Sequence, residues 1–242
     1  MAKSILSVVL SATKKTGHQP WLTASAPGAD ITLMEVKMKL SIIMPVYNQE
    51  DLVLRALKSI PLNTDDIEII LINDGSTDNS LEIMATWMQT HDYLCPIKLI
   101  SSRHNCGIAH AMNVGFDEAK GEYIVSLSSD DYFLTDFSRF MPLLDGQNDL
   151  IYFDLEINDG SIWHLDEKSK KAFVGAVKFI RREFLGKTRI PDLKYREDVP
   201  FSKKLYAKKP KEVFTGVVLK HYNFPREGSL TWQAWEEDQH ED

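Results

Sequence analysis

The chain has 242 residues, of which 43% are hydrophobic and 26% are charged, and two are cysteines. This composition is typical of a globular protein with a sizeable core, and it excludes collagen, coiled coils and wholesale disorder. The apolar run Ile5–Leu10 near the N-terminus is too short for a membrane helix or a secretory signal. Cys95 and Cys106 provide neither a disulfide framework nor a four-thiolate zinc site, so a reducing cytoplasm is the expected compartment.

The formal net charge of −7 is distributed unevenly along the chain. Residues 166–220 contain 16 Lys and Arg against 7 Asp and Glu, a net charge of +9. The remaining residues contain 12 against 28, a net charge of −16. This polarity predicts that the basic segment meets an anionic partner, with a solvated basic face as the alternative.

Residues 1–38 lack periodicity, and we expect a poorly ordered leader there. From residue 39, continuously apolar strands alternate with amphipathic helical stripes. Strands are expected at 40–46, 67–72, 97–100 and 123–127. The first helix is expected after a cap at Asn48, the second after a cap at Asp78 or Asn79, and the third at 108–119. This alternation predicts βαβ units and a mainly parallel sheet.

The pattern changes after residue 133. A hairpin is expected at 150–163 around Asn158–Gly160, a helix at 172–185 and a strand at 213–219. The acidic tail 235–242 is expected to fray. No internal repeat or linker is visible, so we interpret 39–133 as the ligand-binding α/β half of one domain and 134–234 as its second, α+β half.

Polar segments follow each of the first four strands, at 45–48, 73–78, 103–107 and 128–131. In a parallel sheet these segments meet at the carboxyl edge, where ligands bind. Asp130 and Asp131 are adjacent carboxylates that repel each other unless a cation or strong donors share their site. Hard oxygen ligands of this kind suit Mg²⁺ or Mn²⁺, and the alternative is a helix cap.

Six motifs in chain order resemble those of the family-2 glycosyltransferases, inverting enzymes of the GT-A fold, over residues 40–231. They lie at 40–48, 73–78, 105–123, 127–131, 196–201 and 222–231. The resemblance implies an α/β fold with a GT-A-like, Rossmann-type, mainly parallel sheet flanked by helices. It also implies transfer of a sugar from a nucleotide-diphosphate sugar, a UDP-sugar by expectation, to an acceptor hydroxyl.

The resemblance further implies roles for individual residues. The nucleotide base would be bordered by Pro45, Val46 and Tyr47 and would donate a hydrogen bond to Asp74. Further donor-binding positions would be Asn105, Gly107, Asn113, Ser128, Asp130 and Arg226. Asp130 and Asp131 would hold a divalent cation, Mn²⁺ or Mg²⁺, on the diphosphate. Asp198 would be the general base, with Glu197, Lys203 and Lys204 on the acceptor side.

The sequence departs from the family pattern at two positions. Ser128 replaces the first Asp of the Asp-x-Asp element, and Met112 stands where relatives often carry Arg. A catalytically inactive nucleotide-sugar-binding protein is therefore one alternative. A nucleotidyltransferase is disfavoured because 47–50 is not a glycine-rich phosphate loop. Cys106 lacks a base partner in sequence, and His104 and His110 are interpreted as surface residues without zinc-ligand spacing.

The basic segment overlaps the acceptor half, which predicts an anionic acceptor. A lipid-linked glycan or a polysaccharide is favoured, and glycosylation of a hydroxyl-bearing modified base in nucleic acid is the alternative. No transmembrane segment is expected. The predicted location is cytoplasmic, with peripheral contact with the inner face of the membrane as an open alternative.

Overall fold

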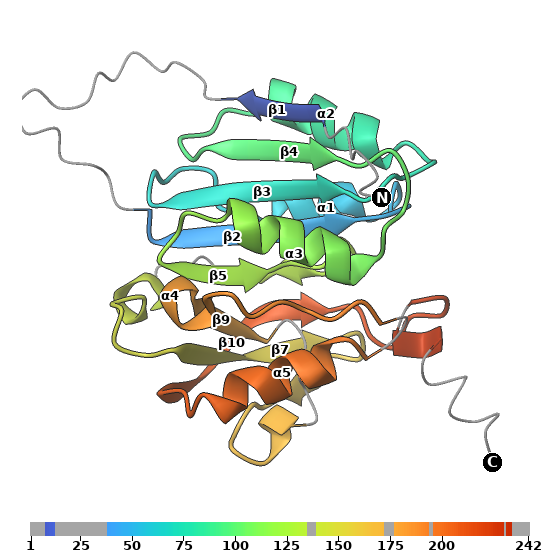
Figure 1. Cartoon of the computed structure of the whole chain (residues 1–242). Helices are drawn as coiled ribbons and strands as arrows, with labels where there is room; N and C mark the ends of the chain where they lie inside the picture. Colours follow the sequence, from blue (N-terminus) through green and yellow to red (C-terminus); the bar gives the residue numbers. More distant parts are fainter. Residues whose placement is uncertain are drawn as a thin grey trace, which may run out of the picture.

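The computed structural model of the chain describes residues 8–12, 38–134, 139–171, 177–193, 196–229 and 231–233. Within these ranges, ten strands form one mixed sheet in the order β1-β4-β3-β2-β5-β9-β7-β10-β6, with β8 paired to β7 (Figure 1). The strands are β1 Val8–Ala12, β2 Leu40–Val46, β3 Ile67–Asn73, β4 Ile97–Ser101, β5 Tyr123–Ser126, β6 Tyr132–Phe133, β7 Leu150–Ile157, β8 Ile162–Trp163, β9 Lys178–Arg181 and β10 Glu212–Tyr222. The α-helices are α1 Val53–Lys58, α2 Ser80–Thr90, α3 Ile108–Glu118, α4 Arg182–Leu185 and α5 Asp198–Ala207. Short 3₁₀ turns, η2 and η3, lie at Met141–Leu143 and Ser169–Lys171.

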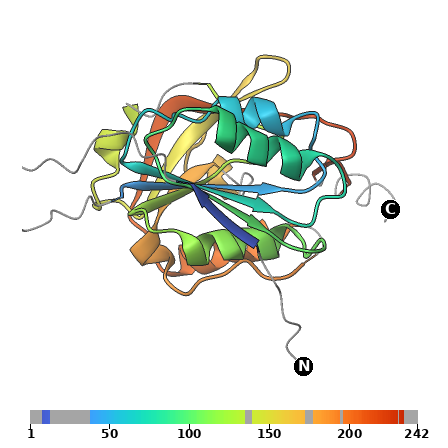
Figure 2. The ribbon, with the colours of Figure 1, turned by 90° about the horizontal axis from the view of Figure 1, so that it is seen from above.

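The first half is the predicted parallel unit. β4, β3, β2 and β5 are parallel neighbours, with α1 and α2 on one face and α3 on the other (Figure 2). Every residue of β2 and β3 is buried. Strands covered on both faces must be apolar on both faces, which explains their continuous apolar sequence. The strands predicted at 40–46, 67–72, 97–100 and 123–127 are confirmed within one residue at each end.

The second half continues the same sheet. β9 is antiparallel to both β5 and β7 and joins the two halves, while β10 is parallel to β7 and antiparallel to β6. The predicted hairpin is confirmed as β7–β8, with Gly160 at a φ of 82° in its turn. The helix predicted at 172–185 is wrong, because 178–181 form β9 and α4 covers 182–185. Residues 172–176 lie outside the described ranges.

Two further differences from the sequence predictions concern local structure. Asn48 does not cap the first helix, which begins at Val53. Instead Asn48 adopts a φ of 50°, and its Oδ1 accepts a hydrogen bond from the Thr77 amide at 2.8 Å. Residues 8–12, placed in the expected leader, pair antiparallel with β4 as β1. The other residues of 1–37 and the tail from 234 are not described. No helix in the described ranges has the length and apolarity needed to cross a bilayer.

A buried polar contact sets the entry of β5 beside β2. Glu68 is 7% exposed, and its Oε1 accepts hydrogen bonds from the Ser41 hydroxyl at 2.6 Å and the Gly121 amide at 3.1 Å. A Cβ at position 121 would lie 2.5 Å from the Ser41 nitrogen and 2.6 Å from the Leu40 carbonyl carbon. The glycine is therefore required by the close approach of two backbones.

We predict that Gly121→Ala destabilises the protein by at least about 2 kcal/mol, because β5 must move away from β2 to admit the methyl group. Urea denaturation measures the change. Lys120→Ala is the matched control, since Lys120 is the exposed neighbour, and it should change the free energy of unfolding by less than about 0.5 kcal/mol. Equal effects of the two substitutions would contradict this role for Gly121.

Candidate active site

The ends of β2, β3 and β5 place polar loops at one edge of the sheet, as the sequence predicts. Pro45 and Val46 are the last residues of β2, and Tyr47 follows with 41% of its surface exposed. The loop after β2 is joined to the loop after β3 by a hydrogen bond from the Asn48 amide to the Ser76 hydroxyl at 3.1 Å. Tyr47 is thus an exposed aromatic ring on a braced loop, consistent with its predicted place beside a base.

Asp74 connects the end of β3 to the loop before α3. Its side chain is buried, and its two carboxylate oxygens accept hydrogen bonds from the backbone amides of Cys106 at 3.0 Å and Gly107 at 2.8 Å. Burial raises the pKa of the Asp74 carboxyl above its usual range, and the two amide donors oppose this shift. These two bonds leave further lone pairs on the carboxylate. The base contact predicted for Asp74 therefore stays a prediction.

Two asparagines predicted to bind the sugar donor use their side chains for hydrogen bonds with the backbone. Asn105 accepts a hydrogen bond from the Gly107 amide at 2.8 Å through its Oδ1. Asn113 donates from Nδ2 to the Ile190 carbonyl at 2.8 Å, and its Oδ1 accepts from the Ile190 amide at 2.9 Å. In this structure Asn113 therefore positions the loop that contains Ile190, and this geometry gives no support to a donor contact.

The two acidic residues after β5 point in different directions. Asp131 is fully buried, lies 3.0 Å from Lys220 Nζ through its Oδ2, and accepts from the Asn223 amide at 2.9 Å through Oδ1. Asp130 is 18% exposed, and its Oδ2 accepts from Arg226 Nη2 at 2.8 Å. Asp131 is therefore an internal anchor for β10, which is poorly suited to the predicted metal role, and Asp130 is the carboxylate that lies nearer solvent.

The surroundings of Asp130 act on the pKa of its carboxyl in opposite directions. Burial raises the pKa of the Asp130 carboxyl, the neighbouring charge of Asp131 raises it further, and Arg226 lowers it. Ser128, the third polar position of this loop, accepts from the Asp131 amide at 3.0 Å through its carbonyl oxygen, which forms a tight turn. The turn places Asp130 beside Arg226, with which it forms an ion pair.

Asp198 and Glu197 lie where α5 begins. α5 crosses the face of β7 and β10 antiparallel to these strands, which brings its first turn toward the carboxyl edge of the sheet (Figure 1). Burial raises the pKa of both carboxyls. The positive charge of Lys178, a residue of β9 that is 3% exposed, lowers the pKa of Asp198 and so opposes this shift. Burial also lowers the pKa of Lys178 to about 8.

Tyr222, the last residue of β10, connects these acidic groups in space. Burial raises the pKa of its phenol, and the charges of Asp131, Asp130 and Asp198 all raise it further. The hydroxyl lies 3.0 Å from Thr231 Oγ1. Three carboxylates from two distant segments thus act on one phenol. The arrangement of the predicted base and the predicted metal-side acid in one site stays a prediction.

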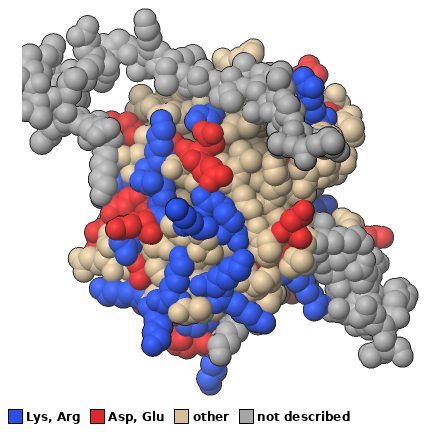
Figure 3. Space-filling view, in the orientation of Figure 1, with Lys and Arg blue, Asp and Glu red and all other residues tan. Residues whose placement is uncertain are grey.

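The predicted acceptor-side lysines are exposed on α5. Lys203 and Lys204 face solvent, and Figure 3 shows Lys and Arg side chains gathered over the lower half of this face. A cavity of about 540 Å³ lies at the far end of α5 and is lined by Lys187, Thr188, Arg189, Lys204 and Lys208. Lys208 also donates to the carbonyls of Phe184 at 2.8 Å and Leu185 at 3.0 Å. Part of the basic segment is therefore folded into one surface. The five residues that line the cavity are here called the basic groove.

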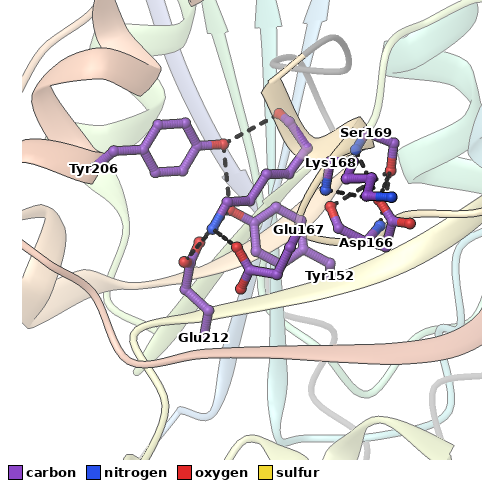
Figure 4. A network of polar contacts seen from close by, with 8 residues as sticks. Tyr152, Asp166, Glu167, Lys168, Ser169, Tyr206 and Glu212 are labelled. Carbon is purple, nitrogen blue, oxygen red and sulfur yellow. Dashed lines mark hydrogen bonds and ion pairs between the residues drawn. The ribbon is translucent and has the colours of Figure 1, made fainter.

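A polar network holds α5 and η3 against the sheet (Figure 4). Glu212 accepts from the Tyr152 hydroxyl at 2.7 Å and from Lys170 Nζ at 2.5 Å. The Tyr206 hydroxyl donates to the Lys170 carbonyl at 3.3 Å and lies 3.3 Å from that of Tyr152. Because Tyr206 belongs to α5 and the other partners to β7, β10 and η3, the network anchors the C-terminal part of α5.

Sequence reasoning missed three residues of the site. Lys220 and Lys178 were counted only as part of the basic segment, although both are buried beside acidic groups. Tyr222 was noted as the start of the closing motif and received no role. A lysine inside an otherwise apolar strand, as in Phe179-Ile180 after Lys178 and Val217-Leu219 before Lys220, is the available signal of a buried partner.

Comparison with known proteins identifies the family. The model of "Glycosyl transferase family 2" matches residues 41–201, which is more than half of the chain. The chain is 39% identical over 98 residues to a poly(ribitol-phosphate) β-glucosyltransferase of Bacillus spizizenii, covering 39% of this chain and 15% of that protein. It is 38% identical over 94 residues to a teichoic acid poly(glycerol phosphate) polymerase of Staphylococcus epidermidis, covering 38% and 13%. The chain thus spans a small part of these curated relatives.

Solved structures show the same fold. Residues 1–349 of TarS from S. aureus in complex with UDP-GlcNAc give a TM-score of 0.67 at 21% identity, covering 80% of this chain and 60% of that one. The mannosyltransferase PcManGT from Pyrobaculum calidifontis, solved with GDP-Man and Mn²⁺, gives 0.64 at 19% identity, covering 91% and 64%. Together with the family match, these likenesses identify a GT-A-like fold. The chain belongs to glycosyltransferase family 2.

The electrostatic effect of Lys178 on Asp198 yields a titration test. We predict that Lys178→Met raises the pKa of the Asp198 carboxyl further, because a positive charge that favours its ionised form is removed. Carboxyl ¹³C NMR titration measures the shift. Lys203→Met, on the exposed side of the same helix, is the control and should leave that pKa nearly unchanged. Similar titrations in both variants would show that Lys178 does not act on Asp198.

Proposed function

We propose that the chain transfers a sugar from a nucleotide-diphosphate sugar to a hydroxyl of an anionic polymer, with inversion at the anomeric carbon. The observation that carries this proposal is the pair of Asp130 and Arg226 after β5, together with the partly buried Asp198 in the first turn of α5, in a chain of glycosyltransferase family 2. A UDP-sugar is the proposed donor. In its support, TarS, which is similar in fold, was solved in complex with UDP-GlcNAc.

The surroundings of Asp130, where the donor would bind, suit a divalent cation. Asp130 offers carboxylate oxygen, the ligand that Mg²⁺ and Mn²⁺ prefer, and a cation would relieve its repulsion with Asp131. Asp130 would hold the ion, with the Ser128 hydroxyl nearby. A bound ion would supply charge neutralisation to the leaving diphosphate, so that no protein acid is needed. Arg226, now paired with Asp130, is placed to contact the same diphosphate.

On the acceptor side of the proposed site, Asp198 takes the proton of the attacking hydroxyl. Burial raises the pKa of the Asp198 carboxyl, which makes it a stronger base than an exposed aspartate, and the positive charge of Lys178 opposes this rise. Attack from the side opposite the diphosphate inverts the anomeric carbon. Glu197 precedes this base on the same turn, and repulsion between the two acids is one cause of its own raised pKa.

The basic groove is the proposed path of the acceptor. Lys204 lies six residues beyond Asp198 on α5, and Lys208 lies ten residues beyond, roughly 9 and 15 Å along the helix axis. A chain molecule with regularly spaced phosphates can place one hydroxyl at Asp198 and its phosphates in the groove. The curated relatives named above, which act on or make poly(ribitol phosphate) and poly(glycerol phosphate), support a polymer of this chemical class.

We predict that Asp198→Asn lowers turnover at least about 100-fold, the usual scale for loss of a general base, while UDP affinity in Mn²⁺ is retained. Asp130→Ala should instead weaken UDP binding in Mn²⁺. The measurements are UDP release from UDP-GlcNAc or UDP-glucose with poly(ribitol phosphate), and calorimetric titration with UDP. Near wild-type turnover of Asp198→Asn, or equal UDP affinity of the two variants, would remove these roles.

For the basic groove, Lys204→Glu should raise the acceptor KM about fivefold, equivalent to roughly 1 kcal/mol of exposed charge interaction, and leave the donor KM unchanged. The acceptor KM should also rise with salt because exposed charges are screened. Lys58→Glu is the matched control, since this exposed lysine ends α1 on the opposite face of the sheet. A KM unaffected by Lys204→Glu and by salt would indicate a neutral acceptor.

A further inference from the structure

Three side chains of types that can bind metals lie close together at the loop that precedes α3. One ligand atom each of Asp74, Cys106 and His110 lies within 4.8 Å of the other two. Asp74 comes from the end of β3, Cys106 from the loop, and His110 from the first turn of α3. Cys106 and His110 are four residues apart in sequence, on either side of the start of α3 at Ile108. The cluster therefore joins two segments at the carboxyl edge of the sheet.

We propose that Asp74, Cys106 and His110 form a binding site for a thiophilic divalent ion of the zinc class. A thiolate, an imidazole and a carboxylate are the mixed sulfur, nitrogen and oxygen donors that Zn²⁺ and Co²⁺ accept, whereas Mg²⁺ prefers oxygen alone. Three protein ligands leave one coordination position open. The site is distinct from Asp130, because β2 separates β3 from β5, which places the two strand ends about 10 Å apart.

The surroundings of the three side chains favour a cation. Nδ1 of His110 is buried and has no hydrogen-bond partner within the described ranges. The Asp74 carboxylate is buried and the Cys106 thiol is partly buried, so a cation placed between them would stabilise both ionised forms. The amides of Cys106 and Gly107 already hold Asp74 in place. One ligand is thus preorganised, and binding needs the approach of the other two.

The position of the site has a consequence that rests on the proposed function. Asp74 is the residue to which the family resemblance assigns the contact with the base of the proposed nucleotide-sugar donor. A metal ion that takes a carboxylate oxygen of Asp74 and fills the space beside it excludes the base. Zinc and the donor nucleoside are therefore expected to compete, independently of the cation at Asp130.

Cobalt titration of the full chain, stripped of metals, tests the site directly. One equivalent of Co²⁺ should produce a thiolate-to-cobalt charge-transfer band that Zn²⁺ abolishes and Mg²⁺ does not. Cys106→Ser should remove the band, and His110→Gln should weaken Co²⁺ binding at least about tenfold. His104→Gln, in the same loop but outside the cluster, is the matched control and should bind as the wild type does.

A second measurement needs no variant. A thiol reagent should modify Cys106 in the native protein, since Cys95 is buried, and saturating Zn²⁺ should slow this modification whereas Mg²⁺ should not. An absent band, Co²⁺ affinity unchanged in His110→Gln, or modification at equal rates with and without Zn²⁺ would overturn the site.

Uridine separates this proposal from the function proposed above, because it lacks the diphosphate that would itself chelate cobalt. Weaker Co²⁺ binding in saturating uridine supports both the metal site and the base contact at Asp74. A band that uridine leaves unchanged supports the metal site and contradicts the base contact.

Discussion

The architecture of the site depends on how two adjacent carboxylates are held at the end of β5. Asp130 and Asp131 could not be buried side by side without positive partners, and both partners come from the end of the chain, Lys220 on β10 and Arg226 just after it. Removal of one member of a buried ion pair typically costs about 3–5 kcal/mol, because the remaining charge is left without compensation. The acid turn and the last strand therefore stabilise each other, although Asp130 and Arg226 are 96 residues apart in sequence.

One antiparallel strand joins the half proposed to bind the donor to the half proposed to bind the acceptor. β9 lies between β5 of the first half and β7 of the second, and it also contributes Lys178, the cation that acts on Asp198. The strand that joins the halves thus also carries the charge that lowers the pKa of Asp198, the proposed base. This arrangement accounts for the absence of a linker in the sequence, because the halves share one sheet and one hydrophobic core.

The parallel half could be predicted because its signals are local. Continuously apolar strands such as 67–73 and the polar segments after them specify both the sheet and its functional edge. The helix predicted at 172–185 failed because apolar residues in Phe179-Ile180 fit a buried strand as well as a helical stripe over so short a run. Asp131, Asn113 and Lys220 were beyond the reach of sequence, since the partner of each lies at least 77 residues away. Residue type predicted their polarity and could not predict which way each side chain faces.

The paired hydrogen bonds between Asn113 and the backbone of Ile190 connect α3 to the loop that contains Arg189. The Asn113 side chain makes the two hydrogen bonds that a neighbouring strand would make. The loop that contributes Arg189 to the basic groove is therefore attached to α3. A displacement of α3 would therefore also move the backbone of Ile190, next to Arg189 of the basic groove. The position of one side of the groove thus depends on a residue that does not line it.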